Sequence, residues 1–173
     1  MKKILFHSNS AKAFTGFGKN AKNILRYLYK TGKYDIIEFA NGLQWGDPSL
    51  SLRPWKAQGS LPNNPSVIQQ INQDPQKGRS AGYGAYTIDA AIKQYKPDVY
   101  LGVEDIWAFA GYYEKPWWNK INNMIWTTLD SQPILPQAIE AAPKTKNFYS
   151  WASFAERYLK KMGHENVGTL HGT

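Results

Sequence analysis

Short apolar runs alternate with segments of helical periodicity along most of this chain. Residues 3–8 have the composition of a first strand. Farther along, Ala21, Leu25 and Leu28 recur at the spacing of one helix face, and Thr31-Gly32 ends that pattern. The other elements follow from the same two patterns. Strands are expected at residues 3–8, 35–40, 99–103, 123–128, 147–150 and 166–170, and helices at residues 19–30, 88–95, 133–142 and 153–162.

Residues 41–82 are the least periodic part of the chain. They contain five prolines together with several glycine and asparagine residues. This composition predicts a long excursion with one or two short elements, among them a strand near residues 55–57. Stretches of this length without regular structure are uncommon inside a domain and are often functional.

Strands that alternate with helices predict right-handed crossovers and a parallel sheet. We therefore expect an α/β fold in which residues 1–173 form one Rossmann-like, three-layer domain, with a mostly parallel, twisted sheet and helices on both faces. Ligands of such sheets bind outside the carboxyl ends of the strands. The turns that hold Gly16, Asp105 and Asp130 are expected to converge along one edge. The segments that follow the expected strands at this edge, and are therefore candidate binding segments, are residues 8–18, 41–46, 104–107, 128–133, 150–153 and 171–173.

The first candidate motif is Thr15-Gly16-Phe17-Gly18, directly before the expected helix at Lys19. Glycines let backbone N–H groups approach a ligand, and a helix N-terminus favours anions. Lys19 adds a positive side chain. The motif matches neither a dinucleotide fingerprint nor a P-loop, and a simple strand-to-helix turn is the alternative.

The second candidate motif is Glu104-Asp105-Ile106-Trp107, which directly follows a buried strand. Carboxylates accept hydrogen bonds from sugar hydroxyls, and an indole offers a flat face for stacking. Alternatively, Asp105 caps a short helix and Trp107 packs in the core.

The third candidate is Asp130-Ser131, which also follows a strand. Either residue could instead cap the next helix. Ser153 is expected to be an N-cap, and Gly163 is expected to end the helix at 153–162. The three histidines have no metal-ligand spacing, and His7 is interpreted as the polar end of the first strand rather than as a base.

Charge and composition narrow the class of protein. The 173 residues suffice for one domain with a real core, and the absence of cysteine excludes disulfides and cysteine-based zinc sites. No apolar run is long enough to span a bilayer, and a cytoplasmic location fits. The net charge is +8, and no acidic residue precedes Asp35. Such a field favours anionic partners, although excess lysine also simply keeps a surface solvated.

In their order and spacing, these segments resemble the N-terminal, acceptor-side domain of GT-B glycosyltransferases, in particular the retaining family-four group. The resemblance covers most of the chain. The matching pieces are residues 3–10 with Thr15-Gly16-Phe17-Gly18, Lys96-Pro97-Asp98-Val99-Tyr100 after a helix, Glu104-Asp105-Ile106-Trp107, Leu129-Asp130 with Pro133, residues 150–163 and residues 167–172.

The resemblance implies transfer of a sugar from a nucleotide-sugar donor to an acceptor, in a cleft between two Rossmann-like domains. It implies no metal, and no cofactor besides the donor substrate. By the same resemblance, Gly16 and Gly18, flanked by Thr15 and Lys19, would approach the donor phosphates or the acceptor. The implied catalytic carboxylates are Asp105 and Glu104, and the implied sugar-binding residues are Trp107, Asp130 and Ser131.

The family's second, donor-binding domain would begin where this sequence reaches His171-Gly172-Thr173. We therefore expect the donor and acceptor to be shared with a C-terminal domain absent from this chain, and the chain alone to be inactive. One alternative is a non-catalytic module that binds an anionic ligand or a protein. Another is a binder of nucleic acid or of the inner membrane surface through its basic helix, although no specific nucleic-acid motif is present.

Overall fold

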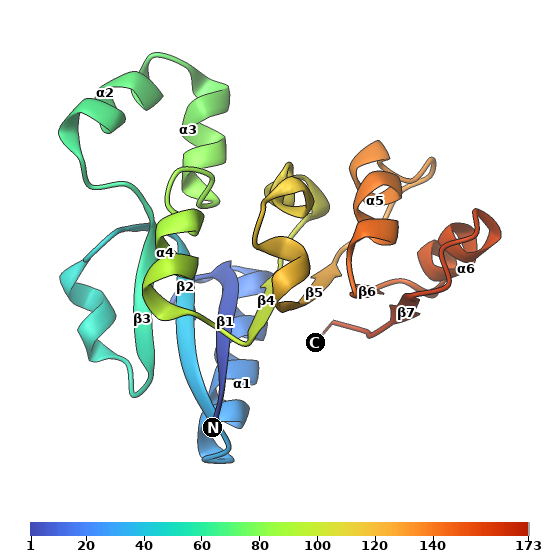
Figure 1. The fold of residues 1–173 in the computed structure, drawn as a ribbon, viewed down its shortest axis with the longest axis horizontal. Coiled ribbons are helices and arrows are strands. Elements are labelled where there is room, and N and C mark those ends of the chain that lie inside the picture. Colours follow the sequence, from blue (N-terminus) through green and yellow to red (C-terminus); the bar gives the residue numbers. More distant parts are fainter. Residues whose placement is uncertain (173) are drawn as a thin grey trace. The chain divides into compact units, whose positions relative to one another are not determined.

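The computed structural model describes residues 1–172, which fall into two compact units, Met1–Asp98 and from Val99 onward. Thr173, which closes the predicted turn at 171–173, lies outside the described residues. Each unit is a small parallel sheet with its own helices (Figure 1).

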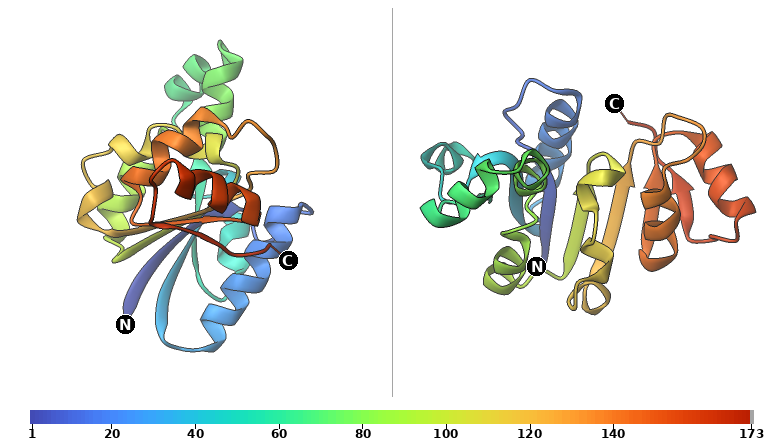
Figure 2. Two further views of the ribbon diagram at one scale, coloured as in Figure 1. Left: turned by 90° about the vertical axis from the view of Figure 1, so that its right-hand side faces the viewer. Right: turned by 90° about the horizontal axis from the view of Figure 1, so that it is seen from above.

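The first unit is built around strand β2, which pairs in parallel with β1 and with β3. The β1–β2 register runs from Lys2 opposite Tyr34 to Asn9 opposite Asn41. Helix α1 lies on one face of this sheet and α4 on the other, as the view from above in Figure 2 shows. The elements are β1 (Lys2–Asn9), α1 (Gly16–Lys30), β2 (Tyr34–Gln44), the 3₁₀ turn η1 (Pro48–Leu52), β3 (Lys56–Leu61), α2 (Pro65–Asn72), α3 (Pro75–Gly82) and α4 (Ile88–Tyr95).

The second unit is a four-stranded sheet in the order β4-β5-β6-β7, and every neighbouring pair is parallel. The predicted α/β, Rossmann-like class with parallel pairing is confirmed. The elements are β4 (Val99–Val103), the 3₁₀ turns η2 (Ile106–Phe109), η3 (Tyr112–Glu114) and η4 (Trp118–Lys120), β5 (Asn122–Thr127), α5 (Pro136–Ala141), η5 (Ala142–Lys144), β6 (Asn147–Ser150), α6 (Ser153–Lys161) and β7 (Val167–Thr169).

Both cores contain aliphatic and aromatic side chains from the strands. In the first unit Leu5 and Ile37 are fully buried. In the second, Tyr100 packs against Trp118 and Tyr112 with ring centroids 5.4 and 6.2 Å apart. Much of the chain's high aromatic content therefore serves packing.

Several boundaries differ from the sequence prediction. Helix α1 begins at Gly16, three residues before Lys19, because Thr15 is its N-cap. Residues 41–82 are not a mostly irregular excursion, since they hold the end of β2 and four further elements. Two of these, α2 and α3, each begin with a proline behind an Asn or Asp cap. The strand expected near residues 55–57 exists as β3.

Two capping predictions for Ser153 and Gly163 have opposite outcomes. Ser153 is the first residue of α6 rather than its N-cap, which is Ala152, and no side chain caps that end. Gly163 does end the helix: its φ is 92°, and its N–H donates to the Lys160 carbonyl at 2.9 Å. Glycine adopts this left-handed conformation just past the end of a helix without strain.

Candidate functional site

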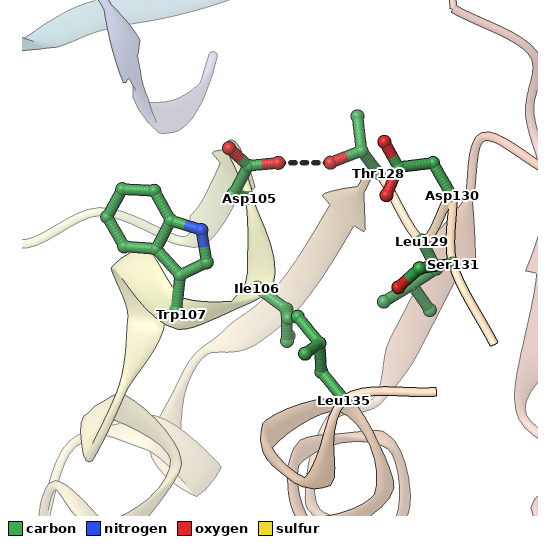
Figure 3. A pocket seen from close by; sticks show the side chains of 8 residues that line it. All are labelled: Asp105, Ile106, Trp107, Thr128, Leu129, Asp130, Ser131 and Leu135. Carbon is green, nitrogen blue, oxygen red and sulfur yellow. Dashed lines mark hydrogen bonds between the residues drawn. The ribbon is translucent and has the colours of Figure 1, made fainter. Parts of the chain in front are cut away.

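A pocket of about 240 Å³ lies where β4 and β5 end (Figure 3). One wall follows β4 and includes Asp105 and Trp107, and the other follows β5 and includes Asp130 and Ser131. The structure therefore brings together four of the predicted site residues. Adjacent parallel strands bring these turns side by side because the carboxyl ends of such strands share one edge. Ile106, Thr128, Leu129 and Leu135 complete the lining.

Asp105 is held in place by Thr128, the residue that directly follows β5 on the opposite wall of the pocket. The Thr128 hydroxyl donates a hydrogen bond to Asp105 Oδ1, as the dashed line in Figure 3 marks. Asp105 occupies the N-cap position of η2, yet its side chain makes no capping hydrogen bond. The capping alternative is therefore wrong for this carboxylate, which is oriented by Thr128 instead.

Asp130 and Ser131 are exposed and line the pocket. The predicted helix start at Pro133 is wrong, because α5 begins only at Pro136 with Leu135 at its N-cap position. Neither Asp130 nor Ser131 therefore caps it. Their polar groups face solvent and the pocket, where an incoming hydroxyl could bind them.

Trp107 and Glu104 differ in their access to this pocket. Trp107 is half-buried and lines it, so core packing accounts for only part of its side chain. Glu104 is 2% exposed at the end of β4 and is not part of the lining. Its catalytic assignment stays a prediction, with access to the Glu104 carboxylate restricted by burial.

The other predicted site residues, Thr15, Gly16, Gly18 and Lys19, belong to the first unit at the start of α1. The Thr15 hydroxyl oxygen accepts from Gly18 N at 3.0 Å and from Asn9 Nδ2 at 2.8 Å. A Cβ on Gly18 would lie 2.3 Å from the Ala13 carbonyl oxygen, whereas one on Gly16 would meet nothing within 4 Å. Gly18 is thus a packing requirement, and Gly16 is the open glycine that a ligand could approach.

A second pocket, of about 330 Å³, which the sequence patterns do not reveal, lies along the C-terminal parts of β1 and β2. Asn9, Asn41 and Gly42 line it from the strand ends, and Arg79 and Tyr83 line it from α3 and its C-cap. The sequence patterns do not point to Arg79, because they predict a largely irregular segment at residues 41–82. The signal that could have found α3 is Asp74-Pro75, an N-cap followed by a proline at the first helical position.

One lining residue of this pocket, Asn41, is bound by a buried histidine: His7 lies within β1 and hydrogen-bonds through Nε2 to Asn41 Oδ1 at 2.7 Å. Burial lowers the pKa of His7 to about 4, against a smaller opposing effect of the hydrogen bond. At neutral pH the ring is uncharged, so Nε2–H donates to Asn41 and fixes one wall of the pocket. His7 is thus not the polar end of the first strand, because β1 continues to Asn9; its interpretation as a group other than a base stays a prediction, which its burial and its hydrogen bond to Asn41 support.

Within residues 1–172, no three His, Cys, Asp or Glu side chains gather in a way that could hold a metal ion. No helix in the same part of the chain is long and apolar enough to cross a bilayer.

No protein-family model and no curated protein sequence matches this chain. Several solved structures do match it. The apo form of the lipopolysaccharide outer core galactosyltransferase WaaB aligns with 99% of this chain at 13% identity and a TM-score of 0.58. The UDP-GlcNAc 2-epimerase from Methanocaldococcus jannaschii aligns with 98% of it at 15% identity and a TM-score of 0.52. In both cases this chain spans 45% of the other protein's length. The chain thus has the α/β, Rossmann-like fold found in a part of that transferase and of that epimerase.

Proposed function

We propose that this chain is the acceptor-binding half of a glycosyltransferase of the GT-B type, which moves a sugar from a nucleotide-sugar donor to an acceptor. The observation that carries the proposal is the pocket at the ends of β4 and β5, where the Asp105 and Asp130 carboxylates and the Trp107 indole meet. Its volume of about 240 Å³ lies below the ~300–1,000 Å³ of drug-sized sites, which fits a single sugar ring.

Each residue has a role in this proposal. Asp130 and Ser131 accept or donate hydrogen bonds at sugar hydroxyls, and Trp107 presents a flat face to the ring. In the complete enzyme, Asp105 accepts the proton of the acceptor hydroxyl as that oxygen bonds to the anomeric carbon of the donor, and the nucleotide leaves with the electron pair of the broken carbon–oxygen bond. Thr128 orients the Asp105 carboxylate for this role. At the start of α1, the open Gly16 and the exposed Lys19 are assigned to the donor phosphates.

Two solved structures with similar folds support a sugar-related role. One is named a galactosyltransferase and the other an epimerase of UDP-GlcNAc. Since this chain spans 45% of each, we infer that the complete reaction uses residues beyond the chain. The chain alone is therefore expected to bind a sugar without turning it over.

The test is a thermal-shift titration of the chain with free sugars and with UDP-, GDP- and ADP-sugars. Ligand at 100 times its Kd stabilises a protein by ~2.7 kcal/mol, which corresponds to ~5–10 °C for a chain of this size. We expect one sugar class to give a saturable rise in the melting temperature. Asp105→Asn and Asp130→Asn should reduce this rise, and Thr128→Val should reduce it less because only the orienting hydroxyl is lost.

The matched control is Glu165→Gln, which removes an exposed carboxylate of the same unit outside the pocket. It should leave the rise unchanged. A rise that is equal in Asp105→Asn and the unmodified chain would overturn the proposed site. Transfer or epimerisation of a nucleotide sugar by the chain alone would overturn its assignment as an inactive half.

A further inference from the structure

A different pocket, of about 220 Å³, lies in the first unit between α1 and the segment that joins η1 to β3. Its apolar surface comes from Ala11, Leu52, Pro54 and Trp55. Leu52 is 71% exposed at the rim of this apolar surface. The pocket therefore presents an apolar surface to solvent.

Three cationic side chains also line this pocket: Lys12 from the loop before α1, and Lys22 and Arg26 from α1. All three are exposed. Within residues 1–172, no acidic side chain forms an ion pair with any of them. Their charges are therefore available to a ligand.

A fourth cationic side chain, Arg53, also lines the pocket, but Glu38 already neutralises its charge, and its role is structural. Its Nε donates to Glu38 Oε2 at 2.7 Å, and its two terminal nitrogens donate to the Ser49 carbonyl at 2.8 Å and to the Ser10 hydroxyl at 2.7 Å. The Trp55 indole N–H donates to the same Glu38 oxygen at 2.7 Å. Trp55 and Arg53 are thus fixed before any ligand arrives, which lowers the entropy cost of binding.

From this geometry we propose that the pocket binds an acidic amphiphile: a phosphate or carboxylate attached to a hydrocarbon or aromatic portion. Lys12, Lys22 and Arg26 bind the anion. Trp55, Pro54 and Leu52 cover the apolar portion. The site is independent of the proposed sugar pocket, because its lining lies within residues 11–55 and that of the sugar pocket within residues 105–135.

The test is calorimetric titration of the full 173-residue chain with dihexanoyl phosphatidic acid as a soluble probe. Dihexanoyl phosphatidylcholine and inorganic phosphate are the comparison probes. We expect saturable binding of the acidic amphiphile, with weaker binding of both comparison probes, since each lacks the net charge or the apolar part. Equal binding of phosphatidylcholine, or no binding of phosphatidic acid, would overturn the proposal.

Two double variants that lose the same charge distinguish binding of the acidic amphiphile in the pocket from attraction by the diffuse positive charge of the surface. Lys22→Ala with Arg26→Ala removes two lining cations, whereas Lys30→Ala with Lys33→Ala removes two exposed cations that do not line the pocket. We expect the affinity for phosphatidic acid to fall at least tenfold in the first double variant and to change less than twofold in the second. Equal losses would show a diffuse charge effect and overturn the site.

The apolar half of the pocket is tested by Leu52→Ser, which is mild because Leu52 is exposed. It should weaken binding of phosphatidic acid several-fold and leave binding of inorganic phosphate unchanged. An unchanged affinity for phosphatidic acid would contradict the apolar contact.

A parallel experiment distinguishes a lipid from a free small molecule and uses phosphatidylcholine vesicles that contain phosphatidic acid. Sedimentation of the chain with them, lost in the Lys22/Arg26 variant, identifies a lipid headgroup as the source, and binding of the short-chain probe alone identifies a free small molecule.

Discussion

Glu38 is a carboxylate buried in the middle of strand β2, at 1% exposure, and its partners stabilise the first unit. One oxygen accepts from Arg53 and Trp55, and the other accepts from the Ala11 N–H at 2.8 Å. The carboxylate therefore ties the loop before α1 to the segment before β3. A charge at this depth is tolerated because every one of these partners is a donor.

We expect Glu38→Gln to be strongly destabilising. Removing one partner of a buried ion pair leaves the other charge uncompensated, which costs ~3–5 kcal/mol in the free energy of unfolding. The control is Asp35→Asn, which breaks the exposed Asp35–Lys56 pair and should cost only ~0–1 kcal/mol. Urea denaturation of both variants measures the two free energies. Similar values for both would contradict the structural role of Glu38.

His7 should make the stability of the chain depend on pH. Its pKa is about 4 when folded and 6.5 in its ordinary state, so the unfolded chain takes up a proton first as the pH falls. The contribution of His7 to the free energy of unfolding is fully present above pH 6.5 and is lost progressively between pH 6.5 and about 4. Below pH 4 it changes no further. A shift of this size corresponds to about 3 kcal/mol.

Urea denaturation between pH 7 and pH 4 measures this loss, and His7→Gln is the control because glutamine retains a donor for Asn41 but does not titrate. The variant should flatten the pH dependence in that window. The same slope in both proteins would show that other groups are responsible.

At the scale of elements, the start of α1 separates two glycines that look alike in the sequence. Gly18→Ala should destabilise the chain by more than 1 kcal/mol, because its Cβ would be 2.3 Å from the Ala13 carbonyl oxygen, which is backbone and cannot move aside cheaply. Gly16→Ala should be neutral or stabilising by up to ~1 kcal/mol, since it has open space and alanine favours a helix. Thermal unfolding measures both; a stability loss in Gly16→Ala would contradict this assignment.

The strands were the elements that the sequence predicted best. The bounds of β4, β6 and α4 agree with the prediction, because a buried strand leaves a continuous apolar run and α4 has a clear apolar face. The start of α1 was placed too late because two glycines in the first turn resemble a loop. Helices α2 and α3 are not evident in the sequence, because the proline that begins each one resembles a break and α3, unlike the equally long α4, has no large apolar side chain to mark a buried face.

The candidate site was predictable only as far as topology positions it. Asp105 and Asp130 were expected to meet because both follow parallel strands, and they do line one pocket. The Thr128–Asp105 hydrogen bond depends on side-chain direction, which spacing along the chain does not reveal. The Glu38–Arg53 pair was likewise hidden, although a lone carboxylate within Ile36-Ile37-Glu38-Phe39-Ala40 signals a buried partner.

At the scale of the whole molecule, charge is the feature that separates the proposed function from the nucleic-acid alternative. The net charge is +8, and the first 34 residues contain no acidic side chain. Diffuse positive charge attracts any polyanion, so weak binding to generic DNA at low salt is expected whatever the function. Its dependence on salt and on DNA sequence is what distinguishes a non-specific effect.

We expect this binding to weaken by roughly a hundredfold between 50 and 200 mM NaCl, as the release of counterions by about four phosphate contacts predicts. It should show no sequence preference in fluorescence-anisotropy titrations. A thermal shift caused by an uncharged sugar should change little over the same range, because hydrogen bonds to Asp105 and Asp130 do not depend on counterion release. DNA binding that persists at 200 mM NaCl with a sequence preference, together with no sugar response, would instead identify a nucleic-acid binder, since contacts to phosphates alone carry no sequence preference and weaken steeply with salt.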